Sequence, residues 1–159
     1  MDDVSLEHVD VNIYYTIQLM VEEQKQLLTN KKITVVNEID KHIEWKAEPE
    51  MLKIIFRNLL NNAIKFTDEN GRISFTYLQD GRYGYVCVKD NGEGISEATI
   101  DKLNAREYNS TNGTANELGS GLGLLLTKDL IERHHGELII ESGSTGGSTF
   151  TVKIPLSPN

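Results

Sequence analysis

The chain has 159 residues, 38% of them hydrophobic, which is enough to bury one core, so a single domain over residues 1–159 is expected. The formal net charge of −8 argues against an open nucleic-acid surface, because binding a phosphate backbone requires a basic patch. The one cysteine, Cys87, excludes an internal disulfide framework and suits a reducing cytoplasm. It lies in an apolar strand and is expected to be a buried, inert thiol.

The first part of the chain predicts one helix and two short strands. Asp10 can cap the helix, because apolar residues follow it at helical spacing. The apolar face of this helix consists of Ile13, Ile17, Met20, Val21 and Leu28. The two strands are expected at 33–39 and 43–46, on either side of Asp40 and Lys41.

A longer helix is expected next, with Pro49 in its first turn, where a missing N–H is tolerated. Asn58, Asn62 and Lys65 share one stripe of this helix, between its apolar and its solvent-exposed face. Amide oxygens suit a hard cation such as Mg²⁺ and an amine suits phosphate, so the stripe could form a pocket wall. The alternative is that the two amides only satisfy buried backbone groups, and the helix alone does not decide between them. The apolar face consists of Leu52, Ile55, Phe56, Leu59, Ala63 and Phe66.

A β-hairpin and a glycine loop are expected after this helix. The strands at 72–78 and 83–89 flank a turn that contains Asp80 and Gly81. The second strand leads into Asp-Asn-Gly-Glu-Gly-Ile at 90–95, and Ser96 can cap a short helix that ends at Leu103.

The segment 104–118 has little periodicity and many Asn, Thr and Gly residues, so we expect a loop, and loops of this length often act as lids. Gly-Ser-Gly-Leu-Gly-Leu at 119–124 opens a helix that ends near Gly136. Glycines at a helix start let backbone N–H groups approach an anion, although a plain turn is the alternative. A last strand pair is expected at 137–141 and 148–155. Together these elements predict a two-layer α/β sandwich.

The motifs at 58–67, 90–95, 119–124 and 147–150, in this order, resemble the ATP-binding catalytic domain of sensor histidine kinases. That domain belongs to the group that includes DNA gyrase B, mismatch-repair ATPases and heat-shock chaperones. The resemblance covers about residues 10–156 and implies a Bergerat-type mixed β-sheet, covered on one face by about three helices. It also implies that 104–118 is the lid.

The resemblance implies a role for individual residues. Asp90 would accept a hydrogen bond from the adenine amino group, with Gly92, Gly94 and Ile95 close to the base and the Thr149 hydroxyl beside the aspartate. Asn62 would be the Mg²⁺ ligand, with Asn58 one turn earlier and Lys65 on phosphate, which makes Asn62 and Lys65 the catalytic pair. Ser110 and Thr111 of the lid would contact the γ-phosphate. The phosphate loop would consist of Gly119, Gly121, Leu122, Gly123 and Leu124. Lys128, farther along the helix, is expected to be a solvated surface charge.

The function implied is transfer of the γ-phosphate of ATP–Mg²⁺ to a histidine on a separate dimerisation domain. The full-length protein would then be a homodimeric kinase that signals to a response regulator, with its catalytic part in the cytoplasm. None of the chain's four histidines has the sequence context of an acceptor, so the acceptor is expected outside this chain. His8 is interpreted as linker, and His134 and His135 as favourable positive charge at a helix end. The Phe-rich box before the lid is weak, because 103–108 keeps only Tyr108.

Three other functions share parts of this pattern. The first is a serine kinase of the anti-sigma-factor type, which has a similar nucleotide site. The second is an ATP-gated clamp, which requires a glutamate where Asn58 stands. The third is a degenerate module that only binds nucleotide, against which the intact Asn62, Asp90 and glycine loop argue.

Overall fold

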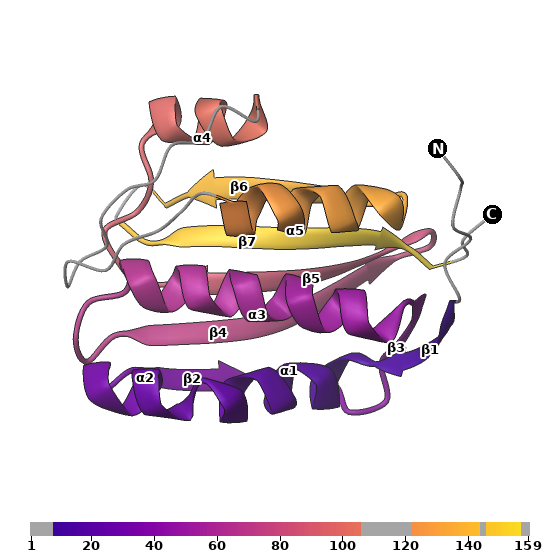
Figure 1. The fold of residues 1–159 in the computed structure, drawn as a ribbon, viewed down its shortest axis with the longest axis horizontal. Coiled ribbons are helices and arrows are strands. Elements are labelled where there is room, and N and C mark those ends of the chain that lie inside the picture. The colour runs from indigo at the N-terminus through magenta and orange to yellow at the C-terminus, as the bar shows by residue number, and fades with distance from the viewer. Residues whose placement is uncertain (1–7, 106–121, 144–145, 157–159) are drawn as a thin grey trace.

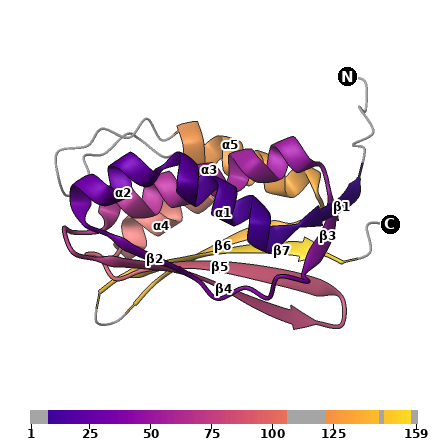
Figure 2. The same ribbon diagram turned by 90° about the horizontal axis from the view of Figure 1, so that it is seen from below.

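The computed structural model describes residues 8–105, 122–143 and 146–156 (Figure 1). Its elements form two layers, a sheet and a set of helices that covers one face of it (Figure 2). This arrangement confirms the predicted two-layer α/β sandwich. The elements are β1 (Val9–Asn12), α1 (Ile13–Glu23), α2 (Lys25–Lys31), β2 (Thr34–Asn37), β3 (Glu44–Ala47), α3 (Pro49–Phe66), β4 (Arg72–Asp80), β5 (Tyr83–Asp90), α4 (Glu97–Asn104), α5 (Leu122–Arg133), β6 (Glu137–Ser142) and β7 (Ser148–Pro155).

The main sheet has five strands in the order β2-β4-β5-β7-β6. The sheet is mixed, because β2 runs parallel to β4 whereas the other neighbours are antiparallel. The predicted hairpin is present as β4 and β5, and the Asp80 carboxylate accepts hydrogen bonds from the backbone N–H groups of Arg82 and Tyr83 in its turn. The predicted last strand pair is present as β6 and β7.

The start of the chain differs from the prediction. Asp10 does not cap α1 but lies in β1, which pairs with β3, and it forms an ion pair with Lys46. The cap is Asn12, whose Oδ1 accepts a hydrogen bond from the Tyr15 N–H. The prediction was wrong because Val9 and Val11 alternate as a strand requires, and Asn is as good a cap as Asp.

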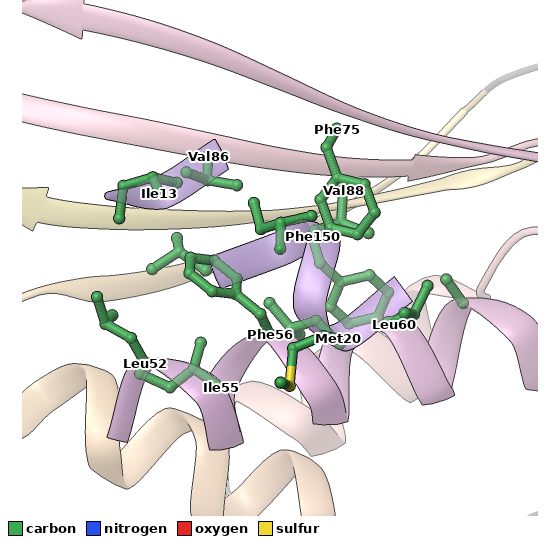
Figure 3. Close-up of a cluster of buried hydrophobic side chains, with 14 of the residues drawn as sticks. Ile13, Met20, Leu52, Ile55, Phe56, Leu60, Phe75, Val86, Val88 and Phe150 are labelled. Carbon is green, nitrogen blue, oxygen red and sulfur yellow. The ribbon is translucent and has the colours of Figure 1, made fainter. Parts of the chain in front are cut away.

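Helix α3 lies across the middle of the sheet and forms the centre of the core (Figure 3). Pro49 occupies the first turn, as predicted, and the Glu48 carboxylate caps the helix by accepting a hydrogen bond from the Met51 N–H. Burying each large apolar side chain of this face contributes about 1.5–3 kcal/mol. This packing fixes which side of α3 is left for the polar stripe. The core contacts around α3 include Leu52, Ile55, Phe56 and Leu60 from the helix and Phe75, Val86, Val88 and Phe150 from the sheet.

Two polar side chains differ from their predictions. Cys87 is half-buried rather than buried, and its Sγ accepts a long hydrogen bond from Thr151 Oγ1. His134 follows the end of α5 but is only 1% exposed, and burial lowers the pKa of its imidazole. Its Nε2 accepts a hydrogen bond from the Glu48 N–H, so the hydrogen lies on Nδ1 and is donated to the Leu130 carbonyl. His134 is therefore a neutral link between α5 and α3 rather than a positive charge at a helix end.

No helix among the described residues has both the length and the apolar character needed to cross a membrane.

Candidate functional site

The predicted motifs meet at one edge of the molecule, on the left in Figure 1. Strand β5 ends there at Asp90, and β7 begins there at Ser148, the residue directly paired with Asp90. Helix α3 ends at the same edge, whereas α5 begins farther in, where Gly123 contacts Asn58 in the middle of α3. Segments far apart in the sequence are thus brought together by the antiparallel pairing of β5 with β7 and by the packing of α3 and α5 on that sheet.

Asp90 is an almost completely buried carboxylate, only 2% exposed. Its Oδ1 accepts a hydrogen bond from the Gly92 N–H at 2.9 Å, and its Oδ2 accepts one from Ser148 Oγ at 2.5 Å. Burial raises the pKa of Asp90, while these bonds and one from the Ser148 N–H lower it. Since an ionised carboxylate has about four acceptor positions, these donors leave room for a further donor.

The hydroxyl beside Asp90 is that of Ser148, not that of Thr149 as the sequence analysis expected. Successive side chains of a strand point to opposite faces of the sheet, so Ser148 lies on the same face as its paired residue Asp90. Thr149 pairs with Lys89 and lies on the other face. The expectation was wrong by one position because two adjacent hydroxyl residues cannot be told apart without the strand register. A contact between Thr149 and a ligand stays a prediction.

The loop after Asp90 is held tightly against its neighbours. A Cβ on Gly92 would lie 2.0 Å from the Phe66 carbonyl oxygen at the end of α3. Gly94 has a φ of +85°, which favours glycine. The Gly147 N–H donates to the Gly92 carbonyl at 2.7 Å, and the Ile95 N–H donates to Ser142 Oγ at 3.0 Å. Packing of the chain on itself therefore already requires the glycine at 92, while contacts of this loop with a base stay predictions.

The two asparagines of the α3 stripe have different surroundings. Asn58 Nδ2 donates to the Gly123 carbonyl at 3.2 Å and to Thr127 Oγ1 at 3.1 Å, which joins α3 to the start of α5. The Asn58 amide thus satisfies a backbone carbonyl, while a contact between Asn58 and a ligand stays a prediction. Asn62 Nδ2 is buried and finds no hydrogen-bond partner in the part of the chain that the structure describes. An unsatisfied buried amide costs about 1–3 kcal/mol, so Asn62 is the polar group of this stripe that is available to a ligand.

Two lysines lie at the end of α3. Lys65 Nζ lies 4.9 Å from the centroid of the Phe66 ring. Lys31, from the end of α2, donates from Nζ to the Ile64 carbonyl at 2.8 Å and contacts the Lys65 carbonyl. These carbonyls belong to the last turn of the helix, which carries a partial negative charge that a cation stabilises. Sequence analysis missed Lys31, because no local pattern connects it with a helix that ends more than thirty residues later.

Helix α5 begins at Leu122, and Leu124 is a core residue that is 8% exposed. Lys128 is not a solvated surface charge as predicted. It is half-buried and donates from Nζ to the Asn104 carbonyl at 2.8 Å, at the end of α4. The predicted lid falls outside the described residues except for Asn104 and Ala105, and so do Tyr108, Ser110, Thr111, Gly119 and Gly121.

Comparisons with known proteins agree with this geometry. The sequence profile of the family described as "Histidine kinase-, DNA gyrase B-, and HSP90-like ATPase" matches residues 47–158. The chain belongs to this family. Its fold is that of the catalytic domain of a histidine kinase, since the solved catalytic domain of histidine kinase ThkA has a TM-score of 0.83 and 26% identity, with 96% of this chain and 98% of that one covered.

Curated relatives of this ATPase domain include a protein named as a histidine kinase and one named as a sensor protein. The circadian input-output histidine kinase CikA of Synechococcus elongatus is 39% identical over 112 residues, which are 70% of this chain and 15% of that protein. The heme sensor protein HssS of Staphylococcus saprophyticus is 26% identical over 149 residues, which are 94% of this chain and 32% of that protein. The chain thus spans at most about a third of these two proteins.

The residues at this edge fit the nucleotide and metal that an ATPase of this family implies. The free acceptor position on Asp90 suits the amino group of adenine. Asn62 Nδ2 is buried and has no hydrogen-bond partner among the described residues, and the oxygen of the same amide is of the kind that suits Mg²⁺. Among the described residues no cluster of three or more His, Cys, Asp or Glu side chains could hold a metal ion. A Mg²⁺ ion would therefore rely on Asn62, phosphate oxygens and water.

Proposed function

We propose that this domain binds ATP–Mg²⁺ and donates the γ-phosphate to a histidine on a separate dimerisation domain of a sensor histidine kinase. The observation that carries the proposal is the environment of Asp90, a buried carboxylate with an acceptor position left over, at the edge where α3 also ends. The printed names of CikA and of the solved ThkA domain support the histidine kinase branch of the family rather than its other members.

Each part of the site has its own task in this proposal. Asp90 takes the adenine amino group, and Asn62 holds the metal ion. Lys65 and the start of α5, where the helix dipole is positive, face the phosphates. When bound, Mg²⁺ would neutralise negative charge that develops on the phosphate oxygens. The other phosphate-loop residues and the lid residues at 104–118 keep the roles that the resemblance implies.

Asn58 supports transfer to an external acceptor over hydrolysis. An ATP-gated clamp needs a carboxylate at this position to take a proton from water. The Asn58 amide cannot take one at neutral pH, and its Nδ2 is bonded to Gly123 and Thr127. The nucleophile would therefore come from the dimerisation domain of a homodimeric full-length kinase, and a response regulator would receive the phosphoryl group next.

The test is to mix the domain with Mg²⁺, ATP labelled on its γ-phosphate, and the dimerisation domain of the proposed full-length kinase. We expect label on the dimerisation domain that is lost in acid and kept in alkali, as phosphohistidine is. Replacing the acceptor histidine by glutamine should abolish it, and Asp90→Asn should reduce it. Acid-stable label would indicate a serine kinase, and rapid release of phosphate without transfer would indicate a clamp. Binding of ATP with neither transfer nor release of phosphate would indicate a binding module. Each of these three results would contradict the proposal.

A further inference from the structure

A threonine in α5 has a buried hydroxyl that the proposed function does not use. Thr127 is 0% exposed and stands in a helix whose neighbouring residues are mostly leucine. A valine would have the same shape and would bury no polar atom. The hydroxyl of Thr127 can therefore contribute to the structure only through its hydrogen bonds.

The Thr127 hydroxyl completes a closed set of three hydrogen bonds. It donates to the Gly123 carbonyl, one turn earlier in α5, at 2.7 Å. Asn58 Nδ2 donates to the same carbonyl at 3.2 Å and to Thr127 Oγ1 at 3.1 Å. The triangle joins Gly123, the last glycine of the cluster and a residue of the first turn of α5, to the polar stripe of α3.

The number of donors in this triangle fixes the orientation of the Asn58 amide. A threonine hydroxyl has one hydrogen, and here it is given to Gly123, so Thr127 can only accept from Asn58. Gly123 likewise presents a carbonyl. Asn58 must therefore direct Nδ2, with both of its hydrogens, towards α5, and a flipped amide would place Oδ1 against two acceptors. Without the Thr127 hydroxyl, one of the two contacts that oppose the flip is lost.

We infer that Thr127 is a positioning residue for the triphosphate: it orients the Asn58 amide and thereby holds the start of α5 in register with α3. The inference rests on the proposed function, because that function assigns the phosphates to Lys65 and the start of α5, and the metal ion to Asn62, one turn from Asn58. Asp90 lies on a different element, at the end of β5, and takes no part in the triangle. Adenosine binding should therefore be insensitive to Thr127, while triphosphate binding should depend on it.

The test is calorimetric titration of wild type, Thr127→Val and Thr127→Ser with adenosine and with a non-hydrolysable ATP analogue plus Mg²⁺. We expect Thr127→Val to bind the analogue about ten-fold more weakly, as the loss of one hydrogen-bonded link predicts, and to bind adenosine within about two-fold of wild type. Thr127→Ser, which keeps the hydroxyl, should restore analogue binding. Equal losses for both ligands, or no loss, would overturn the inference.

Two further variants separate a positioning effect from a general loss of stability. Thr151→Val removes another threonine hydroxyl, which donates to the Cys87 sulfur in the sheet, and it should change neither affinity. In an Asn58→Ala background, Thr127→Val should have little further effect on analogue binding, because its partner is gone. Additive losses in this double-mutant cycle would show that Thr127 does not act through Asn58.

Two measurements cover the remaining outcomes. If Thr127→Val does not fold, hydrogen exchange of side-chain amides by NMR is used on wild type. The Asn58 Nδ2 hydrogens should exchange more slowly than those of Asn61, an exposed asparagine on the same helix, and equal exchange would overturn the inference. If wild type binds neither adenosine nor the analogue, the proposed function itself fails. If it binds both and Thr127→Val is unaffected, only the role of Thr127 fails.

Discussion

Ser148 Oγ donates a hydrogen bond to Asp90 Oδ2 between two residues that face each other directly in β5 and β7. The bond joins the end of one strand to the start of another, at the point where both chains leave the sheet. It occupies one side of a buried carboxylate and leaves an acceptor position that none of the described residues fills. The orientation of the proposed adenine-binding group is thus set by the pairing of the strands.

Ser148→Ala should therefore weaken ADP binding, whereas Thr149→Val should not weaken it through Asp90. Removing a hydrogen bond to a charged group costs about 1.5–3 kcal/mol, and with it the pKa of Asp90 should rise further. Calorimetry with ADP on both variants checks this prediction. A greater loss in Thr149→Val than in Ser148→Ala would show that the sequence-based choice of Thr149 was correct.

The glycine loop gives a prediction about stability. Gly92→Ala should destabilise the domain, because its Cβ would lie 2.0 Å from a backbone carbonyl that cannot move without disturbing the end of α3. Overpacking of this kind costs about 1–3 kcal/mol or more. Gly81→Ala is the matched control, since a Cβ there meets no atom within 4 Å. Chemical denaturation of the two variants measures the difference, and equal stabilities would contradict the packing described for this loop.

Local patterns predicted α3, the β4–β5 hairpin and the cap at Ser96, because periodicity, turn residues and caps act within a few residues of each other. The position of Asp90 at a strand end followed from the same kind of pattern. Contacts such as Asn58 with Thr127 or Lys31 with the end of α3 could not be predicted, since they join residues far apart in the chain. The choice between Ser148 and Thr149 required the register of β7 against β5.

His134 makes the stability of the domain depend on pH. Burial lowers the pKa of its imidazole in the folded state, while in the unfolded chain it titrates near the usual value of about 6.5. At acidic pH the unfolded state then binds more protons than the folded state. The contribution of neutral His134 to stability is therefore present above about pH 6.5 and is lost as the pH falls below that value. Neighbouring charges also affect this pKa: His8 and His135 lower it and Glu48 raises it.

Urea denaturation between about pH 5 and pH 8 checks this dependence. The slope of the unfolding free energy against pH should differ between wild type and His134→Gln by up to about 1.4 kcal/mol per pH unit. Wild type should lose more stability on acidification than His134→Gln. His42→Gln, at an exposed position, should behave like wild type. Parallel curves for wild type and His134→Gln would show that His134 is protonated in the folded state as readily as in the unfolded one.

Asn62 is expected to carry the response to metal. Asn62→Ala should remove most of the Mg²⁺-dependent gain in ATP-analogue affinity without loss of stability in the ligand-free domain, because the buried Nδ2 makes no hydrogen bond there. Asn58→Ala should keep the response to Mg²⁺ but be less stable, because it loses two hydrogen bonds. Titrations with and without Mg²⁺ distinguish the two variants. An equal gain from Mg²⁺ in wild type and Asn62→Ala would exclude Asn62 as the ligand.

Adenine recognition by Asp90 can be measured by calorimetric titration of wild type and Asp90→Asn with ADP. Asparagine keeps the shape of the side chain and removes a buried charge, but its Nδ2 replaces an oxygen that accepts a hydrogen bond, so thermal unfolding is measured beside the titration to show that the variant is folded. Its ADP affinity should fall by about one to two decades, which corresponds to about 1.5–3 kcal/mol for a lost charge-assisted hydrogen bond. A folded Asp90→Asn domain that binds ADP as tightly as wild type would contradict the account.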